Sequence, residues 1–86
     1  MDKLDMLRKQ IDQIDKDLLM LFVKRFSIVK KIGKYKKDNN LPIINEKIED
    51  EKINMLSQSA RNFGVSESFI QAIWRTIFAQ SHKLET

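Results

Sequence analysis

A long, uninterrupted apolar repeat at the start of the chain limits its fold more than any other feature. Apolar side chains recur there at alternating spacings of three and four residues, which is typical of a helix that packs along one seam. The seam positions are Leu4, Leu7, Ile11, Ile14, Leu18, Leu21, Arg25, Ile28, Ile32 and Tyr35. No strong stop precedes Asp38, so the pattern predicts a single helix over residues 4–38.

Two shorter helices are predicted after a turn made of aspartate, asparagine and proline. The second covers residues 46–63, because Asn45 is a good N-cap residue and Gly64 is a natural terminator. The third covers residues 67–84 and begins after Ser66, another N-cap residue. No segment alternates with period two, so no sheet is expected. The prediction is an all-α fold with three helices per protomer.

Both shorter helices carry an apolar face that should pack within one domain spanning residues 1–86. On the second helix this face consists of Ile48, Met55, Leu56 and Phe63. On the third it consists of Ile70, Ile73, Trp74, Ile77, Phe78 and Leu84. Ser81 and Glu85 follow Ile77 at intervals of four residues, so two polar side chains continue the apolar stripe of the third helix.

The length of the first helix implies a second chain. At ~1.5 Å per residue, about 35 residues extend for ~52 Å. A compact monomer of 86 residues has a radius of gyration of about 12 Å, so its diameter is much shorter than this helix. Two helices of fewer than about twenty residues each cannot cover such a seam. We therefore predict a homodimer in which the long helices intertwine, with the two-fold symmetry that is common among dimers.

The composition excludes several kinds of protein. The chain has no cysteine and one histidine, His82, so we expect no disulfide framework, zinc site or histidine-based triad. The charged N-terminal stretch MDKLDMLRKQ does not resemble a signal peptide, and no apolar run approaches the ~20 residues that span a bilayer. We expect a cytoplasmic protein with no metal, no cofactor and no membrane partner. The net charge of +4 is compatible with an anionic ligand.

Arg25 needs a compensating anion within the seam, because an unpaired buried guanidinium costs several kcal/mol. An internal salt bridge, or a side chain that extends to the surface, would also satisfy it. Lys36 lies about 16 Å further along nearly the same helix face, so both cations could lean toward one small anion. Arg8 lies ~25 Å from Arg25 on the same helix and can share its ligand only from a partner chain. Without a partner, Arg8 is a solvated arginine.

Several other residues have a simple structural interpretation. Gly33 costs about 1 kcal/mol within a helix and marks a place where another element could approach closely. Glu49 is one of several carboxylates on the second helix, and Glu85 lies next to the end of the chain. The remaining lysines in the second half of the first helix are interpreted as a solvated face: Lys24, Lys30, Lys31, Lys34 and Lys37.

As a whole the sequence resembles the AroQ class of chorismate mutases, and the match covers essentially the whole chain without gaps. The stretches that carry the resemblance are LRKQIDQIDKDLLMLFVKR, IGKYK, LPIIN, IEDEKINML and IWRTIFAQSHKLE. The most specific part is L-R-x-x-I-D-x-I-D, followed by an arginine and G-K-x-K. The resemblance implies a three-helix protomer whose long first helices intertwine in a homodimer, in agreement with the length argument.

The resemblance further implies the Claisen rearrangement of chorismate to prephenate, on the branch toward phenylalanine and tyrosine, without a nucleophile, metal or cofactor. Such a site fixes a folded dicarboxylate and supplies donors where the ether oxygen gains negative charge. By resemblance, Arg25 would bind one carboxylate and Arg8 of the partner chain the other. Lys36 would donate to the ether oxygen and Glu49 would accept from the ring hydroxyl. Ser81 would lie beside a carboxylate.

Three positions depart from the family's pattern. Glu85 stands where many members have a glutamine that donates to the ether oxygen, and a glutamate donates only when it is protonated. We therefore expect activity to fall with rising pH. Asn45 and Ile48 stand where members commonly have an aspartate and an arginine. One cationic contact is thereby lost, and Lys47 and Lys52 are the nearby cations that could replace it.

Three alternatives stay open on the sequence alone. A lyase that releases pyruvate from isochorismate would use a closely similar site on the same fold. A non-catalytic helical module would bind a partner protein or nucleic acid through its lysine face, but it lacks the stacking aromatics of single-strand binders. A regulatory association with another shikimate-pathway enzyme is the third. We favour the mutase and expect no nucleic-acid partner, because a module leaves Arg25, Gly33, Ser81 and Glu85 unexplained as a set.

Overall fold

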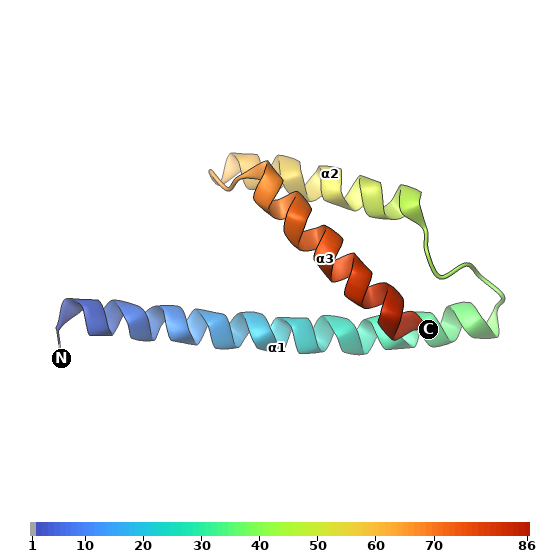
Figure 1. The fold of residues 1–86 in the computed structure, drawn as a ribbon, viewed down its shortest axis with the longest axis horizontal. Coiled ribbons are helices and arrows are strands. Elements are labelled where there is room, and N and C mark those ends of the chain that lie inside the picture. Colours follow the sequence, from blue (N-terminus) through green and yellow to red (C-terminus); the bar gives the residue numbers. More distant parts are fainter. Residues whose placement is uncertain (1) are drawn as a thin grey trace.

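The computed structural model describes residues 2–86, and these form three helices (Figure 1). The helices are α1 (Lys3–Asp38), α2 (Glu46–Asn62) and α3 (Glu67–Glu85). No strand occurs in the described part of the chain. The prediction of an all-α fold with a long first helix is confirmed, and each helix begins and ends within one residue of its expected bounds.

Polar side chains explain where the three helices begin. The side chains of Asp2, Asn45 and Ser66 each accept a hydrogen bond from the backbone N–H three residues later, at 2.8, 3.2 and 3.3 Å. Each bond satisfies an amide that has no acceptor within its own helix. The helices therefore start where the sequence supplies an oxygen acceptor.

Two residues with positive φ explain where α1 and α2 end. Asn40 has φ +54° and Gly64 has φ +70°, the left-handed region that these residue types tolerate best. After each of them, the next backbone N–H donates to a carbonyl five positions earlier, at 2.8 and 2.9 Å. These bonds are those of a Schellman motif, which satisfies carbonyls in the last helical turn.

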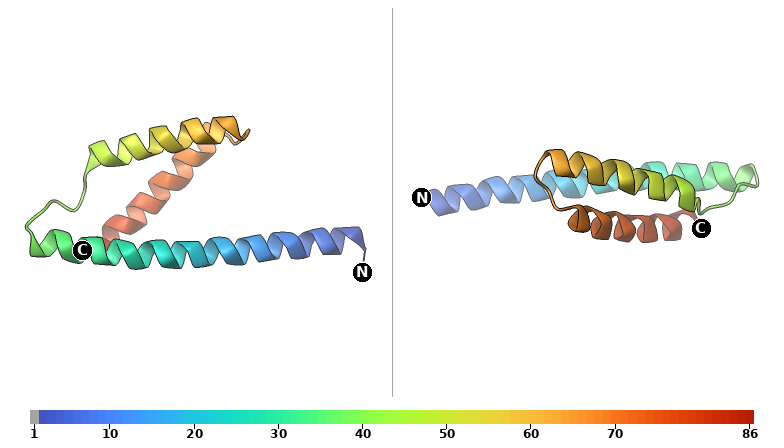
Figure 2. Two further views of the ribbon diagram at one scale, coloured as in Figure 1. Left: turned by 180° about the vertical axis from the view of Figure 1, so that it is seen from behind. Right: turned by 90° about the horizontal axis from the view of Figure 1, so that it is seen from above.

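The third helix holds the molecule together, because α3 packs against both α1 and α2. Within residues 2–86, α1 and α2 do not pack against each other. Figure 2 shows α2 and α3 lying close together and the C-terminal end of α3 resting on α1. The buried apolar side chains are Val29, Ile53, Ala60, Ile77 and Phe78.

The predicted apolar face of α3 is buried or half-buried, but the predicted face of α2 is partly wrong. Three of its four residues are 57–83% exposed and only Leu56 is half-buried; the exposed ones are Ile48, Met55 and Phe63. The face that α2 buries instead contains Ile53, Ser57 and Ala60. The small residues Ser57 and Ala60 let two helices approach closely, yet they contribute little to a pattern of large apolar side chains. That pattern alone therefore misplaced part of the buried face of α2.

Within residues 2–86, the N-terminal half of α1 meets another segment only where Leu18 and Leu21 line an apolar groove shared with α3. Its large seam residues are 45–59% exposed: Leu4, Leu7, Ile11, Ile14, Leu18 and Leu21. Figure 1 shows the first part of this half extending beyond α2 and α3. The molecule is 57 Å long with a radius of gyration of 16.5 Å, above the ~12 Å of a compact chain of this length. In the described residues no helix has both the length and the apolar character needed to cross a bilayer.

Candidate active site

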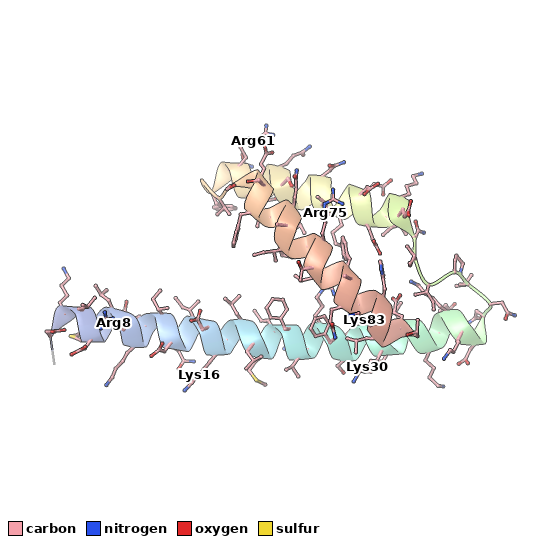
Figure 3. All side chains as sticks on the ribbon, in the orientation of Figure 1. Arg8, Lys16, Lys30, Arg61, Arg75 and Lys83 are labelled. Carbon is pink, nitrogen blue, oxygen red and sulfur yellow. The ribbon has the colours of Figure 1, made fainter. Side chains whose placement is uncertain are left out.

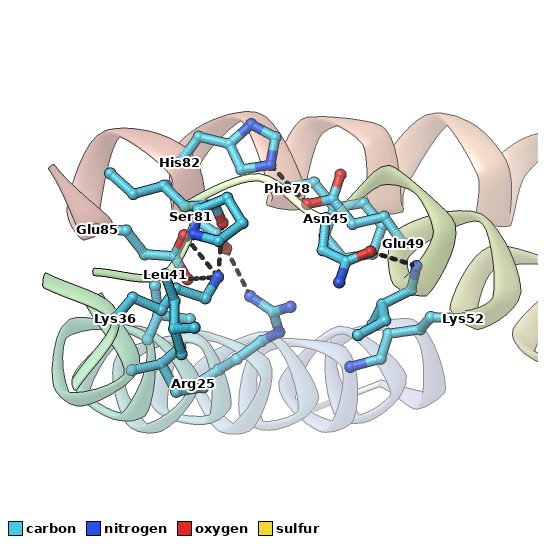
Figure 4. Close-up of a pocket in the computed structure, with 15 residues that line it drawn as sticks. Arg25, Lys36, Leu41, Asn45, Glu49, Lys52, Phe78, Ser81, His82 and Glu85 are labelled. Carbon is cyan, nitrogen blue, oxygen red and sulfur yellow. Dashed lines mark hydrogen bonds and ion pairs between the residues drawn. The ribbon is translucent and has the colours of Figure 1, made fainter. Parts of the chain in front are cut away.

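A cavity of about 410 Å³ lies where α1, α3 and the start of α2 converge, and residues of the α1–α2 connection close one side of it (Figure 4). Apolar side chains from all of these segments form much of its wall. Five of the six site residues predicted from the sequence also line it: Arg25, Lys36, Glu49, Ser81 and Glu85. The fold thus brings together residues up to 60 positions apart in the chain.

Arg25 extends from α1 into this cavity and meets a neutral partner. Its Nη1 donates to the Ser81 hydroxyl at 2.8 Å, and its guanidinium carbon lies 5.9 Å from the centre of the Phe78 ring. Burial lowers the pKa of the Arg25 guanidinium, while the negative charge of Glu85 acts in the opposite direction. Arginine nevertheless keeps its proton throughout the ordinary pH range. A permanent cation is therefore held at the cavity, and no carboxylate within residues 2–86 forms an ion pair with it.

Lys36 and Glu85 form an ion pair at the other end of the cavity. The Lys36 ammonium lies 3.3 and 3.4 Å from the two carboxylate oxygens of Glu85, and it also donates to the backbone carbonyl of Ile43. The Lys36 and Glu85 side chains are only 21% and 8% exposed. The pair links α1 to the last residue of α3, while the bond to Ile43 fixes the connection between α1 and α2.

The close approach expected at Gly33 is confirmed, and its partner is the end of α3. A Cβ atom built on Gly33 would lie 2.7 Å from the Cα atom of Glu85 and 2.9 Å from its carbonyl oxygen. A side chain of any size at position 33 would therefore push the backbone of α3 away from α1. Gly33 is buried, and its lack of a side chain lets Glu85 reach the cavity.

Glu49 lines the cavity from α2 and contacts a residue that the sequence analysis did not include in the site. His82 Nε2 lies 2.6 Å from Glu49 Oε2. His82 belongs to the same face of α3 as Phe78, Ser81 and Glu85, since these four positions follow the spacing i, i+3, i+4, i+7. That spacing is the sequence signal that would have assigned His82 to the site.

The cation that could replace the missing arginine of α2 is Lys52. Ile48 and Lys52 both line the cavity, one helical turn apart, whereas Lys47 does not. No ion pair involving Lys52 occurs within residues 2–86. Asn45 also lines the cavity, although its side-chain oxygen is engaged as the N-cap of α2.

Arg8 does not reach the cavity within one chain. It lies on the exposed N-terminal half of α1, far from the end of α3 (Figure 3). Seventeen residues of helix separate it from Arg25, which corresponds to ~25 Å. Its predicted role across a dimer interface stays a prediction.

The charges and hydrogen bonds of the cavity suit the binding of an anion. Three cationic side chains and two carboxylates line it, so it attracts negative charge. The Ser81 hydroxyl donates to the backbone carbonyl of Ile77 at 2.9 Å, which leaves no general base to activate it as a nucleophile. The described residues contain no group of three or more potential metal-ligating side chains. The arrangement favours positioning and electrostatic stabilisation over covalent chemistry.

Comparison with known proteins identifies similar sequences. The family model described as "Chorismate mutase type II" matches residues 7–86. The T-proteins of Haemophilus influenzae and Enterobacter agglomerans are each 32% identical to the chain, over 85 and 83 residues. These alignments cover 99% and 96% of the chain and 22% of each relative.

A third relative has a name that states two activities. The protein called "Bifunctional chorismate mutase/prephenate dehydratase" from Aquifex aeolicus is 34% identical over 88 residues, which cover 99% of the chain and 24% of that protein. The chain thus spans about a quarter or less of the length of the curated relatives it matches. No solved structure gave a significant match.

Proposed function

The chain belongs to the chorismate mutase type II family, and from this premise we propose that it catalyses the Claisen rearrangement of chorismate to prephenate. The reaction is unimolecular. The ether C–O bond breaks while a C–C bond forms between the side chain and the ring, with no net exchange of protons or electrons. The protein has to select the folded conformer of a dicarboxylate and stabilise the negative charge that grows on the ether oxygen.

In this proposal Arg25 binds one substrate carboxylate. Its partner in the free protein is the Ser81 hydroxyl at 2.8 Å. A carboxylate is a stronger acceptor than a hydroxyl and can engage the guanidinium through two parallel bonds. Substrate binding therefore exchanges a neutral contact for a charge-assisted one, and Ser81 is left beside the same carboxylate. This half-buried cation bonded to a neutral partner is the observation that carries the proposal.

The second substrate carboxylate is assigned to Arg8 of the partner chain in a homodimer. The exposed apolar seam in the N-terminal half of α1 supports this dimer, because two intertwined α1 helices would cover both seams. Antiparallel pairing would bring each Arg8 toward the cavity of the other chain. Lys52 lines the cavity of its own chain and supplies the cation that Ile48 does not. Each dimer would contain two sites.

Lys36 and Glu85 are assigned to the ether oxygen. Their Nζ and Oε1 atoms lie 3.3 Å apart, so one substrate oxygen placed beside the pair would be within reach of both side chains. The Lys36 ammonium donates whenever it is charged, whereas Glu85 donates only when it carries a proton. Glu49 is assigned to the ring hydroxyl. It would accept through the carboxylate oxygen that His82 does not hold.

A second enzyme that uses the product is a proposed partner. The name of the Aquifex aeolicus relative joins a chorismate mutase to a prephenate dehydratase in one protein. The short span of this chain relative to that protein is compatible with a separate or linked enzyme of the same pathway. On this basis we place the chain in the synthesis of phenylalanine and tyrosine.

Incubation of the purified protein with chorismate tests the proposed function. Loss of the ultraviolet absorbance of chorismate, with prephenate identified as the product, is the expected result. Release of pyruvate from isochorismate without prephenate formation would indicate the related lyase instead. No turnover of either compound, together with salt-sensitive binding of an oligonucleotide, would indicate a non-catalytic module.

A further inference from the structure

The contact between Glu49 and His82 separates two cavities. Both residues line the site cavity, and both also line a second cavity of about 220 Å³ bounded by α2 and α3. Glu49 Oε2 and His82 Nε2 lie 2.6 Å apart, and the two side chains are 23% and 27% exposed. Figure 4 shows the contact at the edge of the site, with Ser81 and Phe78 nearby on α3. The pair thus forms a polar bridge from α2 to α3 at the edge of the site.

The bridge fixes the direction of the Glu49 carboxylate. An ionised carboxylate can only accept, so the imidazole Nε2–H is the donor in this contact. The contact holds one carboxylate oxygen of Glu49 and leaves the other available to the site. A free glutamate side chain samples several rotamers about its three rotatable bonds. His82 therefore reduces the conformational freedom of a residue that has to point at the substrate.

The charge of the imidazole also bears on the site. With a neutral His82, the three cations and two carboxylates of the cavity give a net charge of +1. A protonated His82 raises this to +2 before the proposed contribution of Arg8 from the partner chain, and each added positive charge strengthens the attraction for a dianion. Histidine is the side chain whose charge ordinarily changes between about pH 5 and 8. His82 also lies in the last turn of α3, where the helix dipole favours a cation.

Charged groups surround the imidazole on both sides of the bridge. On the site side they are Arg25 and Lys36 from α1, Lys52 from α2 and Glu85 from α3. On the side of the second cavity they are Asp50 from α2 and Arg75 from α3. Asp50 and Arg75 carry opposite charges and contribute no net charge to this side. Protonating His82 adds one positive charge at the boundary of the site.

We propose that His82 is a positioning residue that orients Glu49, and that its positive charge raises the affinity of the cavity for its dianionic substrate at mildly acidic pH. The inference rests on the proposed function, because chorismate is the dianion concerned. It adds a pH effect that is distinct from that of Glu85. Protonation of Glu85 acts on the chemical step and therefore on kcat, whereas protonation of His82 acts on binding and therefore on KM.

The single histidine of the chain makes the contact observable without any ligand. A proton NMR spectrum at low temperature should contain a downfield Nε2–H resonance that is protected from exchange by the bond to Glu49. Glu49→Ala should abolish this resonance, and Glu51→Ala, which changes an exposed neighbour on α2, should leave it in place. No protected resonance in the wild type, or its persistence in Glu49→Ala, would overturn the contact.

The effect on affinity is tested with two substitutions of the same residue. In the wild type we expect KM for chorismate to be about three- to tenfold lower near pH 6 than near pH 8, from one added charge several ångströms from the ligand. His82→Gln keeps a donor for Glu49 but cannot become charged, so its KM should stay near the alkaline value throughout. His82→Leu also loses the donor, so its KM should be higher at both pH values. Lys83→Gln is the matched control for a change at the neighbouring exposed position.

The same measurements in a Glu85→Gln background separate the two pH effects. The pH dependence of KM should persist there and should disappear only when His82 is also replaced by glutamine. An active protein in which His82→Gln keeps the full wild-type dependence of KM on pH would overturn the inference and leave the proposed function intact. A wild type that does not convert chorismate would overturn the proposed function and the affinity effect together. The NMR experiment would still decide the contact with Glu49.

Discussion

The two halves of α1 carry one continuous apolar repeat but have different surroundings. In the C-terminal half, α3 covers a face that includes Val29 and Gly33 and borders the cavity, while the seam residues of this half stay 42–63% exposed: Ile28, Ile32 and Tyr35. In the N-terminal half, no segment within residues 2–86 covers the seam up to Ile14, which is 52% exposed. The repeat therefore indicates which face of the helix needs a partner, but it does not indicate which chain supplies that partner.

The contrast assigns a different role to each half. The C-terminal half builds a cavity within its own chain. It carries Arg25 and Lys36, the two cations that the proposed function assigns to a substrate carboxylate and to the ether oxygen. The N-terminal half carries Arg8 and an exposed apolar seam, which a second copy would cover. Substitutions in the C-terminal half should therefore impair the site without separating the chains. Substitutions in the N-terminal half should impair the site and also separate the chains.

Removal of the half-buried cation from the C-terminal half should have the largest effect. Arg25→Ala deletes the guanidinium assigned to a substrate carboxylate, and we expect kcat/KM to fall by about 10³-fold or more. The chain should stay folded and dimeric, because the variant removes a charge whose desolvation opposes burial. Circular dichroism, sedimentation and turnover measure these outcomes. Lys30→Ala, on the exposed face of the same helix (Figure 3), is the matched control, and wild-type turnover by Arg25→Ala would refute the assigned site.

A charge in the exposed seam should separate the chains. Ile14→Asp exchanges an apolar contact worth about 2 kcal/mol for a carboxylate that would have to be buried, and two-fold symmetry applies the change twice. We expect sedimentation velocity to report a monomer and turnover to fall by about 100-fold, because Arg8 no longer reaches the other cavity. Lys16→Asp lies on the opposite face of the same helical segment and should leave the dimer intact. An unchanged dimer in Ile14→Asp would contradict the role given to this half.

The two glycines should respond differently to alanine. Gly33→Ala introduces a Cβ atom 2.7 Å from the Cα atom of Glu85, so the end of α3 must move. We expect kcat/KM to fall about tenfold and the melting temperature to fall as well, because the contact is with the backbone of α3 and outweighs the about 1 kcal/mol that alanine gains in helix propensity. Gly64→Ala has open space but φ +70°, so it should cost about 1 kcal/mol of stability and leave kcat/KM unchanged. Thermal melts and kinetics test both, and wild-type kinetics for Gly33→Ala would contradict the prediction.

The smallest expected effect is a change in the shape of a pH profile. In the proposed mechanism, protonated Glu85 would donate to the ether oxygen and ionised Glu85 would repel it, so the kcat of the wild type should decline several-fold as the pH rises from acidic to neutral. Glu85→Gln donates at every pH and should give a flat profile. Steady-state kinetics across this range measure both proteins. A flat wild-type profile would remove Glu85 from the chemical step.

The helices could be predicted from the sequence because their signals are local. Asn45 and Ser66 cap helices, Gly64 ends one, and the apolar period marks the seam of α1, all within a few residues. The close approach at Gly33 was also predictable, because a glycine inside a strong helical pattern has few other uses. The identity of its partner was not, since α3 arrives from more than fifty residues later.

The parts that could not be predicted depend on how helices cross. Ser57 and Ala60 face α3 because α2 and α3 pack closely there, and neither residue stands out by hydrophobicity. The contact between Glu49 and His82 joins positions 33 residues apart, and no local pattern sets that distance. The assignment of Lys52 rather than Lys47 to the cavity likewise depends on which face α2 turns toward α1.

Mixing two impaired variants tests whether each α1 helix contributes an arginine to both sites of a dimer. Arg8→Ala and Arg25→Ala should each have little turnover as pure dimers. After subunit exchange, a mixed dimer has one site with both arginines and one site with neither. We predict that an equal mixture recovers about a quarter of wild-type activity, since half of the dimers are then mixed and each holds one complete site. Turnover that stays at the level of the separate variants after exchange would contradict the proposal that Arg8 completes the site of the partner chain.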